Sequence, residues 1–99
     1  MTIKVHRLPM RRMDVRLIDD DTRSVLIDDQ EGGTHVLNPT ARAIWELCDG
    51  TTTLDELVDA ICKVFSVPHG VALRDVAAVL AQFEGAGLVS WGPDHGEGV

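Results

Sequence analysis

The chain has 99 residues, 44% of them apolar, and a formal net charge of −7 at pH 7. This length suits one domain with a single modest core. No stretch approaches the ~20 apolar residues of a membrane span, and residues 1–13 contain no continuous apolar run of the secretory-signal type. We therefore expect a globular cytoplasmic protein with no membrane partner.

The charge is unevenly distributed along the chain. The first twelve residues contain Lys4, Arg7, Arg11 and Arg12 and no acid, whereas the rest of the chain holds five basic and sixteen acidic side chains. Such an acidic body repels nucleic acid and anionic membranes and favours basic segments of a partner. We expect residues 1–13 to form a solvated, mobile basic arm, with contact to an acidic partner as the alternative.

Three short segments rich in β-branched and aliphatic residues, Asp14–Ile18, Ser24–Asp28 and Thr34–Leu37, predict β-strands. The connectors 19–23 and 29–33 are rich in Asp and Gly and have the length of hairpin loops. The simplest topology is a three-stranded antiparallel meander with the second strand in the middle. Its third strand then lies at an edge of the sheet.

Two helices with strong start signals follow the strands. Asn38 is placed to cap a helix whose first residue is Pro39, and Gly50 supplies its stop. Thr53 and Glu56 form a capping-box pattern at the start of the second helix. Apolar residues then recur at helical spacing in both segments, which predicts one buried stripe on each helix.

The third helix is predicted from residue 71 or 72 to residue 86, and Gly87 ends it. Its apolar positions cover roughly 200° of the helix surface, about twice the arc of an ordinary surface helix. Either the helix is deeply buried, or one apolar edge that includes Val79 and Phe83 lines a groove. We expect one domain over residues 14–91 and a flexible tail over 92–99.

No catalytic or metal-binding constellation is present in the sequence. Cys48 and Cys62 lie among apolar residues without a CxxC spacing, and the four histidines are scattered. There is no GxSxG, Walker-type or HExxH motif. We therefore expect a protein that is not an enzyme and that needs no cofactor or metal.

An exposed edge strand is a site where another chain can add a strand. Thr34–Leu37 carries neither Lys nor Pro to prevent such pairing. Backbone pairing gives sequence-tolerant affinity, and side-chain pockets beside the edge select particular residues of the added peptide. The sequence alone therefore favours an interaction surface.

Several motifs occur in an order and spacing that resemble the PqqD-like family of domains, which recognise the precursors of ribosomally made, post-translationally modified peptides. They are Leu37-Asn38-Pro39-Thr40-Ala41, Ile44-Trp45, Asp49-Gly50, Thr53-Leu54-Asp55-Glu56-Leu57, Asp75-Val76, Leu80 and Gly87-Leu88-Val89. The resemblance implies an α+β, winged-helix-like fold of three strands and three helices. It also implies a non-catalytic peptide chaperone that binds a leader peptide by strand addition and presents it to a modifying enzyme, either a radical S-adenosylmethionine enzyme or a leader peptidase.

By this resemblance the peptide lies between the third strand and the third helix. Asp75 is expected to pair with a basic residue of the leader. The alternative is a structural role, in which Asp75 stabilises the helix as an acid in its first turn. The peptide-binding residues are expected to be Thr34, His35, Val36, Leu37, Asp75, Val76, Val79 and Phe83.

Two other functions fit the same elements. A winged-helix DNA-binding regulator requires a basic recognition helix, but residues 70–87 contain one Arg against Asp75 and Glu84. A self-associating structural module is the second alternative, because an exposed edge can pair with its copy.

Overall fold

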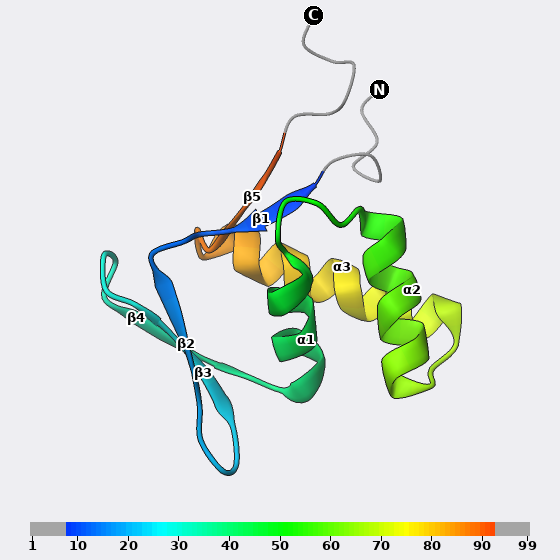
Figure 1. Cartoon of the computed structure of the whole chain (residues 1–99), viewed down its shortest axis with the longest axis horizontal. Helices are drawn as coiled ribbons and strands as arrows, with labels where there is room; N and C mark the ends of the chain where they lie inside the picture. The colour runs from blue at the N-terminus through cyan, green and yellow to red at the C-terminus, as the bar shows by residue number, and fades with distance from the viewer. Residues whose placement is uncertain (1–7, 93–99) are drawn as a thin grey trace, which may run out of the picture.

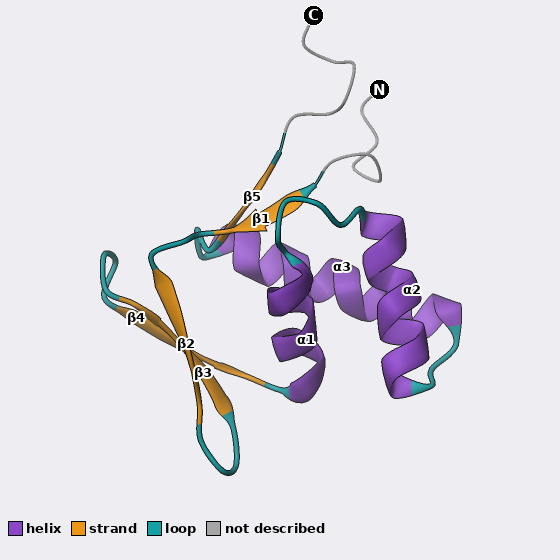
Figure 2. Ribbon diagram, viewed as in Figure 1, coloured by secondary structure: helices purple, strands orange, loops and turns teal. Residues whose placement is uncertain are grey.

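The computed structural model describes residues 8–92, which form two antiparallel sheets and three helices (Figures 1 and 2). The order of strands followed by helices confirms the expected α+β class. The elements are β1 (Pro9–Arg11), β2 (Val15–Asp19), β3 (Ser24–Asp28), β4 (Gly33–Leu37), α1 (Pro39–Leu47), α2 (Leu54–Phe65), α3 (His69–Gly85) and β5 (Val89–Trp91).

The larger sheet is the predicted meander, with strand order β2-β3-β4 and antiparallel pairing throughout. Its register places Leu26 of β3 opposite Leu17 of β2 and His35 of β4. Side chains alternate between the faces of a strand, so these three residues share the face that carries the fully buried Leu26. The helices gather on one side of the meander, next to this core face (Figure 1).

The first two helices begin at the predicted capping residues. The Asn38 side chain accepts a hydrogen bond of 2.8 Å from the backbone N–H of Ala41, and Pro39 is the first helical residue. In α2, Glu56 N–H donates to the Thr53 hydroxyl at 3.1 Å, while Thr53 N–H donates to the Glu56 carboxylate at 2.9 Å. Each cap satisfies backbone donors that a helix start leaves without an intrahelical partner.

The third helix begins earlier than its apolar pattern indicates. Pro68 occupies the position before the helix, and α3 starts at His69 rather than at residue 71 or 72. The first two residues, His69 and Gly70, are exposed, so they add nothing to the apolar periodicity from which the sequence reveals a helix start. At the other end Gly87, with φ of 73°, turns the chain so that Leu88 N–H reaches the carbonyl of Phe83 at 2.8 Å.

A single core joins the meander and the helices. Trp45 of α1 and Phe83 of α3 pack edge to face, with ring centroids 5.4 Å apart. Cys48 is fully buried as a free thiol, and burial raises its pKa to about 12. The buried apolar residues are Val15, Leu26, Leu37, Ala41, Ile44, Trp45, Cys48, Leu57, Val58, Ile61, Ala72, Val76, Leu80, Phe83, Leu88 and Val89.

Within residues 8–92, no individual helix has the length and apolar composition needed to cross a membrane. Helices α2 and α3 meet that test only as a pair, and the pair is bent by 117°.

The N-terminal segment differs from the expected mobile basic arm wherever the structure describes it. Pro9–Arg11 forms β1, which pairs with β5 in a second sheet. Arg11 donates to the carbonyls of Trp45, Glu46 and Cys48 at the end of α1, at 3.3, 2.9 and 3.4 Å. Carbonyls at a helix end lack the usual intrahelical partner, and the Arg11 side chain adds donors to them, which a charge count alone does not reveal. The rest of the predicted arm, 1–7, and the predicted tail beyond Gly92 lie outside the described residues.

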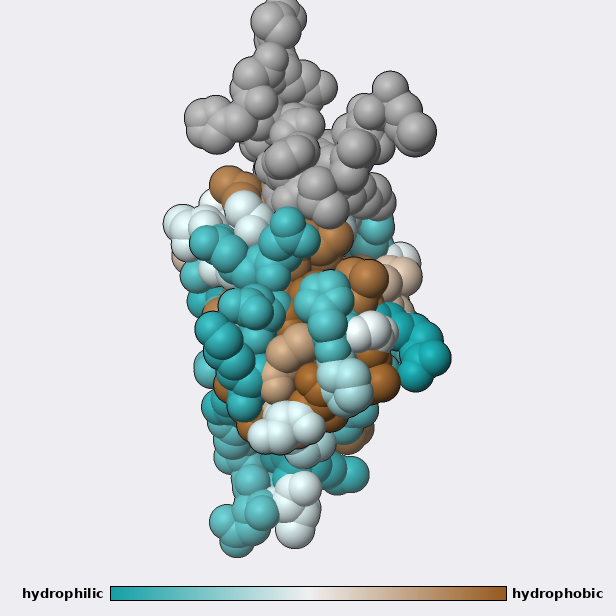
Figure 3. Space-filling view, turned by 90° about the vertical axis from the view of Figure 1, so that its right-hand side faces the viewer, coloured by the Kyte–Doolittle hydropathy of each residue, from teal (hydrophilic) through white to brown (hydrophobic). Residues whose placement is uncertain are grey.

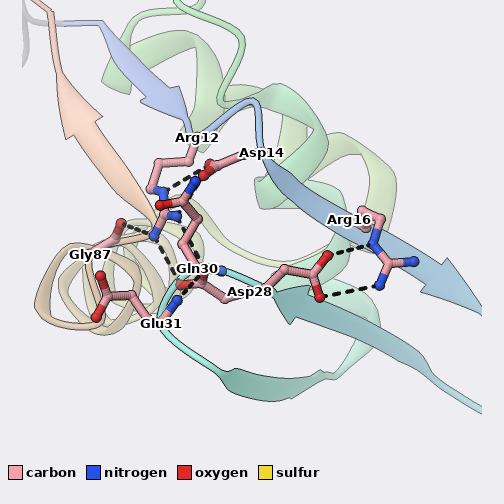
Figure 4. Close-up of polar contacts among 8 residues, drawn as sticks. Arg12, Asp14, Arg16, Asp28, Gln30, Glu31 and Gly87 are labelled. Carbon is pink, nitrogen blue, oxygen red and sulfur yellow. Dashed lines mark hydrogen bonds and ion pairs between the residues drawn. The ribbon is translucent and has the colours of Figure 1, made fainter.

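Arg12 and Asp28 form the main polar link between the N-terminal segment and the meander (Figure 4). Arg12 donates two hydrogen bonds to the Asp28 carboxylate, at 2.9 and 3.1 Å, and its Nη1 reaches the carbonyl of Gly87 at 3.3 Å. Asp28 is 1% exposed and also accepts the N–H groups of Gln30 and Glu31. Burial raises the pKa of Asp28, but the N–H of Glu31, the Arg12 guanidinium and the N–H of Gln30 outweigh burial and hold this pKa below its ordinary value.

We expect Arg12→Ala to lower the thermal unfolding midpoint by several degrees, because it leaves the buried Asp28 carboxylate without its cation. Arg16→Ala is the matched control, since Arg16 and Asp29 form a pair with both side chains more than half exposed, at 58% and 64%. Calorimetric scans of both variants test the comparison. Equal small shifts for the two variants contradict a structural role for the Arg12–Asp28 pair.

Candidate peptide-binding site

Strand β4 has one neighbour in the meander, β3, so its other edge is open within the described structure. The hydrogen bonding of the β2–β3 hairpin shows which β4 residues direct their backbone groups toward this open edge. Asp20 N–H donates to the carbonyl of Arg23 at 2.9 Å, which makes these two residues a hydrogen-bonded pair. Such pairs alternate along an antiparallel ladder, so Val25 also turns its backbone groups toward β2 and Leu26 turns its groups toward β4.

The same alternation continues into β4. Leu26 lies opposite His35, and Ser24 lies opposite Leu37, so His35 and Leu37 use their backbone groups to pair with β3. The intervening residues Thr34 and Val36 therefore direct their N–H and C=O groups outward. These groups are the pairing positions that the edge offers to an added strand.

The side chains of β4 divide between the two faces of the sheet. Thr34 and Val36 are exposed, Val36 at 60%, and point away from the core. His35 is half-buried and Leu37 is 6% exposed, both on the core face. Gly33 leaves room for the His35 ring, whose Nε2 would lie 3.1 Å from a Cβ at that position. The four predicted strand residues thus lie on one edge strand. Thr34 and Val36 direct their backbone groups outward, and the side chains of His35 and Leu37 face the helices.

An open hollow of about 620 Å³ lies beside the Leu37 end of this edge. In one wall of this hollow, Nη2 of Arg42, on α1, lies 2.6 Å from the Asp19 carboxylate. The Arg42 guanidinium and the Ser24 hydroxyl lower the pKa of Asp19 to about 2. The hollow is lined by Asp19, Asp20, Thr22, Arg23, Ser24, Val36, Leu37, Asn38, Pro39 and Arg42. Sequence reasoning missed it, because the β2–β3 turn and the start of α1 are distant along the chain.

The predicted residues on α3 occupy different environments. Val76 and Phe83 belong to the core, at 0% and 4% exposure, whereas Val79 is half-buried and Asp75 is exposed. Positions 75 and 79 are one helical turn apart and share one edge of the helix. The main packing partners of α3 are α2, α1 and β5, and those of β4 are β3 and α1. The two halves of the predicted site are therefore linked through α1 and the core. Of the four predicted α3 residues, only Val79 and Asp75 have side-chain surface that a ligand can contact.

A second hollow lies on the opposite, helical side. It has a volume of about 140 Å³ and is lined mainly by apolar residues of α2, α3 and β5, Leu54, Ala77, Leu80, Ala81 and Trp91, together with Glu84. Figure 3 shows the face toward α2, where apolar side chains are exposed between hydrophilic ones. None of the predicted peptide-binding residues lines this hollow. In residues 8–92 no group of three or more His, Cys, Asp or Glu side chains is arranged to hold a metal ion.

These features define an α+β domain in which an antiparallel meander with an open edge precedes three helices. A family model described as coenzyme PQQ synthesis protein D (PqqD) matches residues 23–89, and the chain belongs to this family. The match begins just before β3 and ends in β5, so it includes β4, α1 and α3. No curated protein matches the chain.

Two solved structures are similar to the chain over most of its length. TbiB1, solved in complex with the TbiA(beta) leader peptide, is 27% identical, with a TM-score of 0.71 over 82% of this chain and 94% of that one. A lasso peptide synthetase B1, complexed with its leader peptide, is 22% identical, with a TM-score of 0.73 over 84% of this chain and 98% of the other. The second likeness supports the fold alone.

Amide hydrogen exchange followed by NMR tests the assigned direction of the edge. We expect the amides of Thr34 and Val36 to exchange rapidly, because they face solvent, and those of His35 and Leu37 to be protected by pairing with β3. Uniform protection of all four amides, or the opposite alternation, contradicts the assignment.

Proposed function

We propose that the protein is a non-catalytic peptide chaperone that binds the leader region of a ribosomally made precursor peptide and presents it to a modifying enzyme. The observation that carries this proposal is the open edge of β4, with the backbone groups of Thr34 and Val36 directed outward. Membership of the PqqD family and the likeness to TbiB1, a protein solved with a leader peptide, support it. The enzyme is a radical S-adenosylmethionine enzyme or a leader peptidase.

The leader adds to β4 as a fourth strand of the meander. Its backbone pairs with Thr34 and Val36, and its side chains on the core side meet His35, Leu37 and the half-buried Val79. The hollow at the Leu37 end receives a side chain at one end of the peptide. Val76 and Phe83, both buried, support this surface from below rather than touching solvent.

The charge of α3 favours a peptide over a nucleic acid. Its exposed charged side chains are Arg74, Asp75 and Glu84, one cation against two acids. Phosphate binding needs several cations on the docking helix. Asp75 instead suits a Lys or Arg of the leader, at a surface position where such a pair contributes modestly.

Val36→Pro tests strand addition directly. We expect it to weaken leader binding by about tenfold or more, because proline removes the outward N–H and crowds an incoming strand. Val36→Thr is the matched control, since it changes the side chain and keeps the N–H. Calorimetric titration with a synthetic leader peptide, beginning with the TbiA(beta) leader bound by the similar TbiB1, measures the affinity, and thermal scans verify folding. Unchanged affinity in folded Val36→Pro rules out pairing at this edge.

Val79→Asp tests the contribution of α3. We expect roughly tenfold weaker leader binding, since the substitution places a charge at a half-buried apolar contact, with destabilisation of about 1 kcal/mol. Ala78→Asp adds the same charge at an exposed neighbouring position of the same helix. Equal affinities for the two variants, measured by the same titration, place the peptide away from α3.

A further inference from the structure

The outer face of the meander carries aliphatic side chains that nothing in the described structure covers. The register aligns Ile18 of β2, Val25 of β3 and Val36 of β4 in one row across the sheet. Their outward direction follows from alternation, because Leu17, Leu26 and Leu37 lie on the core face. Ile18 is 42% exposed and Val36 60%, while Val25 is half-buried by its neighbours.

A solvated face of an antiparallel sheet normally carries polar residues that alternate with the apolar residues of the core face. Here Ile27 lies beside the aliphatic row, on the same face, between Arg16 and Thr34. Aliphatic residues thus occupy most central positions on both faces of β3. This composition is typical of a strand that is covered on both sides.

Acidic turns lie at both ends of the strands that carry the aliphatic row. Asp20 and Asp21 lie in the β2–β3 turn, and Asp29 and Glu31 lie in the β3–β4 turn, all of them exposed. Arg16 offsets part of this charge, because it pairs with Asp29 at 3.2 Å. The face therefore presents an apolar centre between acidic ends, and its complement is an apolar surface flanked by Lys or Arg.

We propose that this outer face is the docking surface for the modifying enzyme, which contacts it with an apolar patch bordered by basic residues. The inference rests on the proposed function and assigns the partner to a surface separate from the peptide groove. The two surfaces share β4: its outward backbone groups bind the leader, and the Val36 side chain belongs to the aliphatic row.

This shared strand couples the two partners. A leader strand paired with β4 widens the meander by one strand, and every second leader side chain then continues the outer face beyond Val36. The enzyme consequently contacts protein and leader across one continuous sheet. It binds the leader-loaded protein more tightly than the free protein, and the leader in turn binds more tightly in the presence of the enzyme.

Ile18→Lys separates the outer face from the peptide edge, because β2 is the strand farthest from the open edge of β4. Ile18→Thr keeps a β-branched residue and serves as the milder variant should Lys impair folding. Val64→Lys is the matched control, since Val64 is 67% exposed but lies on α2. The probes are the synthetic leader peptide and the purified modifying enzyme that acts on its precursor.

Calorimetry is expected to give wild-type leader affinity for all three variants, within about twofold. The affinity of the enzyme for each leader-loaded variant is then measured by surface plasmon resonance. We expect it to be about tenfold weaker for Ile18→Lys, less strongly weakened for Ile18→Thr, and unchanged for Val64→Lys. Wild-type protein without leader is expected to bind the enzyme more weakly than the loaded protein.

Three results overturn the inference. Enzyme affinity that is unchanged in folded Ile18→Lys places the enzyme elsewhere. A wild-type dimer in light scattering that Ile18→Lys dissociates assigns the face to a second copy of this chain. An enzyme affinity that is the same with and without the leader contradicts the proposed coupling between the two partners. By contrast, wild-type protein that fails to bind the leader at all refutes the proposed function itself, and the same titrations distinguish this case.

Discussion

The buried carboxylate of Asp28 is the constraint on which the arrangement of the meander depends. A carboxylate that is 1% exposed must be hydrogen-bonded, and its partners are three: the Arg12 guanidinium of the N-terminal segment and the N–H groups of Gln30 and Glu31 in the β3–β4 turn. The last two fix the β3–β4 turn, and the pairing that follows this turn sets the register of β4. Arg12 also holds the carbonyl of Gly87. The Arg12–Asp28 pair thus joins the N-terminal segment, the β3–β4 turn and the turn that follows α3.

The geometry of the edge strand β4 determines which of its residues can bind a peptide through the backbone and which contact the core through their side chains. Backbone groups of an antiparallel strand alternate in direction within the sheet, while side chains alternate between its faces. In β4 both alternations fall on the same residues, so Thr34 and Val36 offer outward backbone and outer-face side chains, whereas His35 and Leu37 hold β3 and face the core. A slip of one residue would exchange all four roles. The turn that Asp28 stabilises therefore determines which residues a ligand meets.

The sequence predicted the meander, the caps of α1 and α2 and the family, because each of these depends on short-range signals such as Asn38-Pro39 or Thr53 with Glu56. It placed Val76, Val79 and Phe83 together, but helical spacing alone does not distinguish a buried position from a half-buried one that is a turn away. Both strands of the second sheet were missed, since three residues are too few to establish a period of two. The sequence assigned Arg11 and Arg12 to a charged arm. Apart from Asp14, which pairs with Arg12, their partners are more than ten residues away along the chain and no sequence pattern reveals them.

Two outward residues provide four backbone hydrogen-bonding groups, and this small number limits what strand addition achieves alone. At about 1 kcal/mol net for each hydrogen bond, the edge supplies roughly 4 kcal/mol, which is no more than the lowest estimates for the loss of translational and rotational freedom on association. Most of the affinity must then come from side chains of the leader against His35, Leu37, Val79 and the hollow beside α1. A short edge also gives little to an unrelated strand, which limits unwanted pairing between copies. The same shortness that protects the free protein therefore makes recognition depend on the sequence of the peptide.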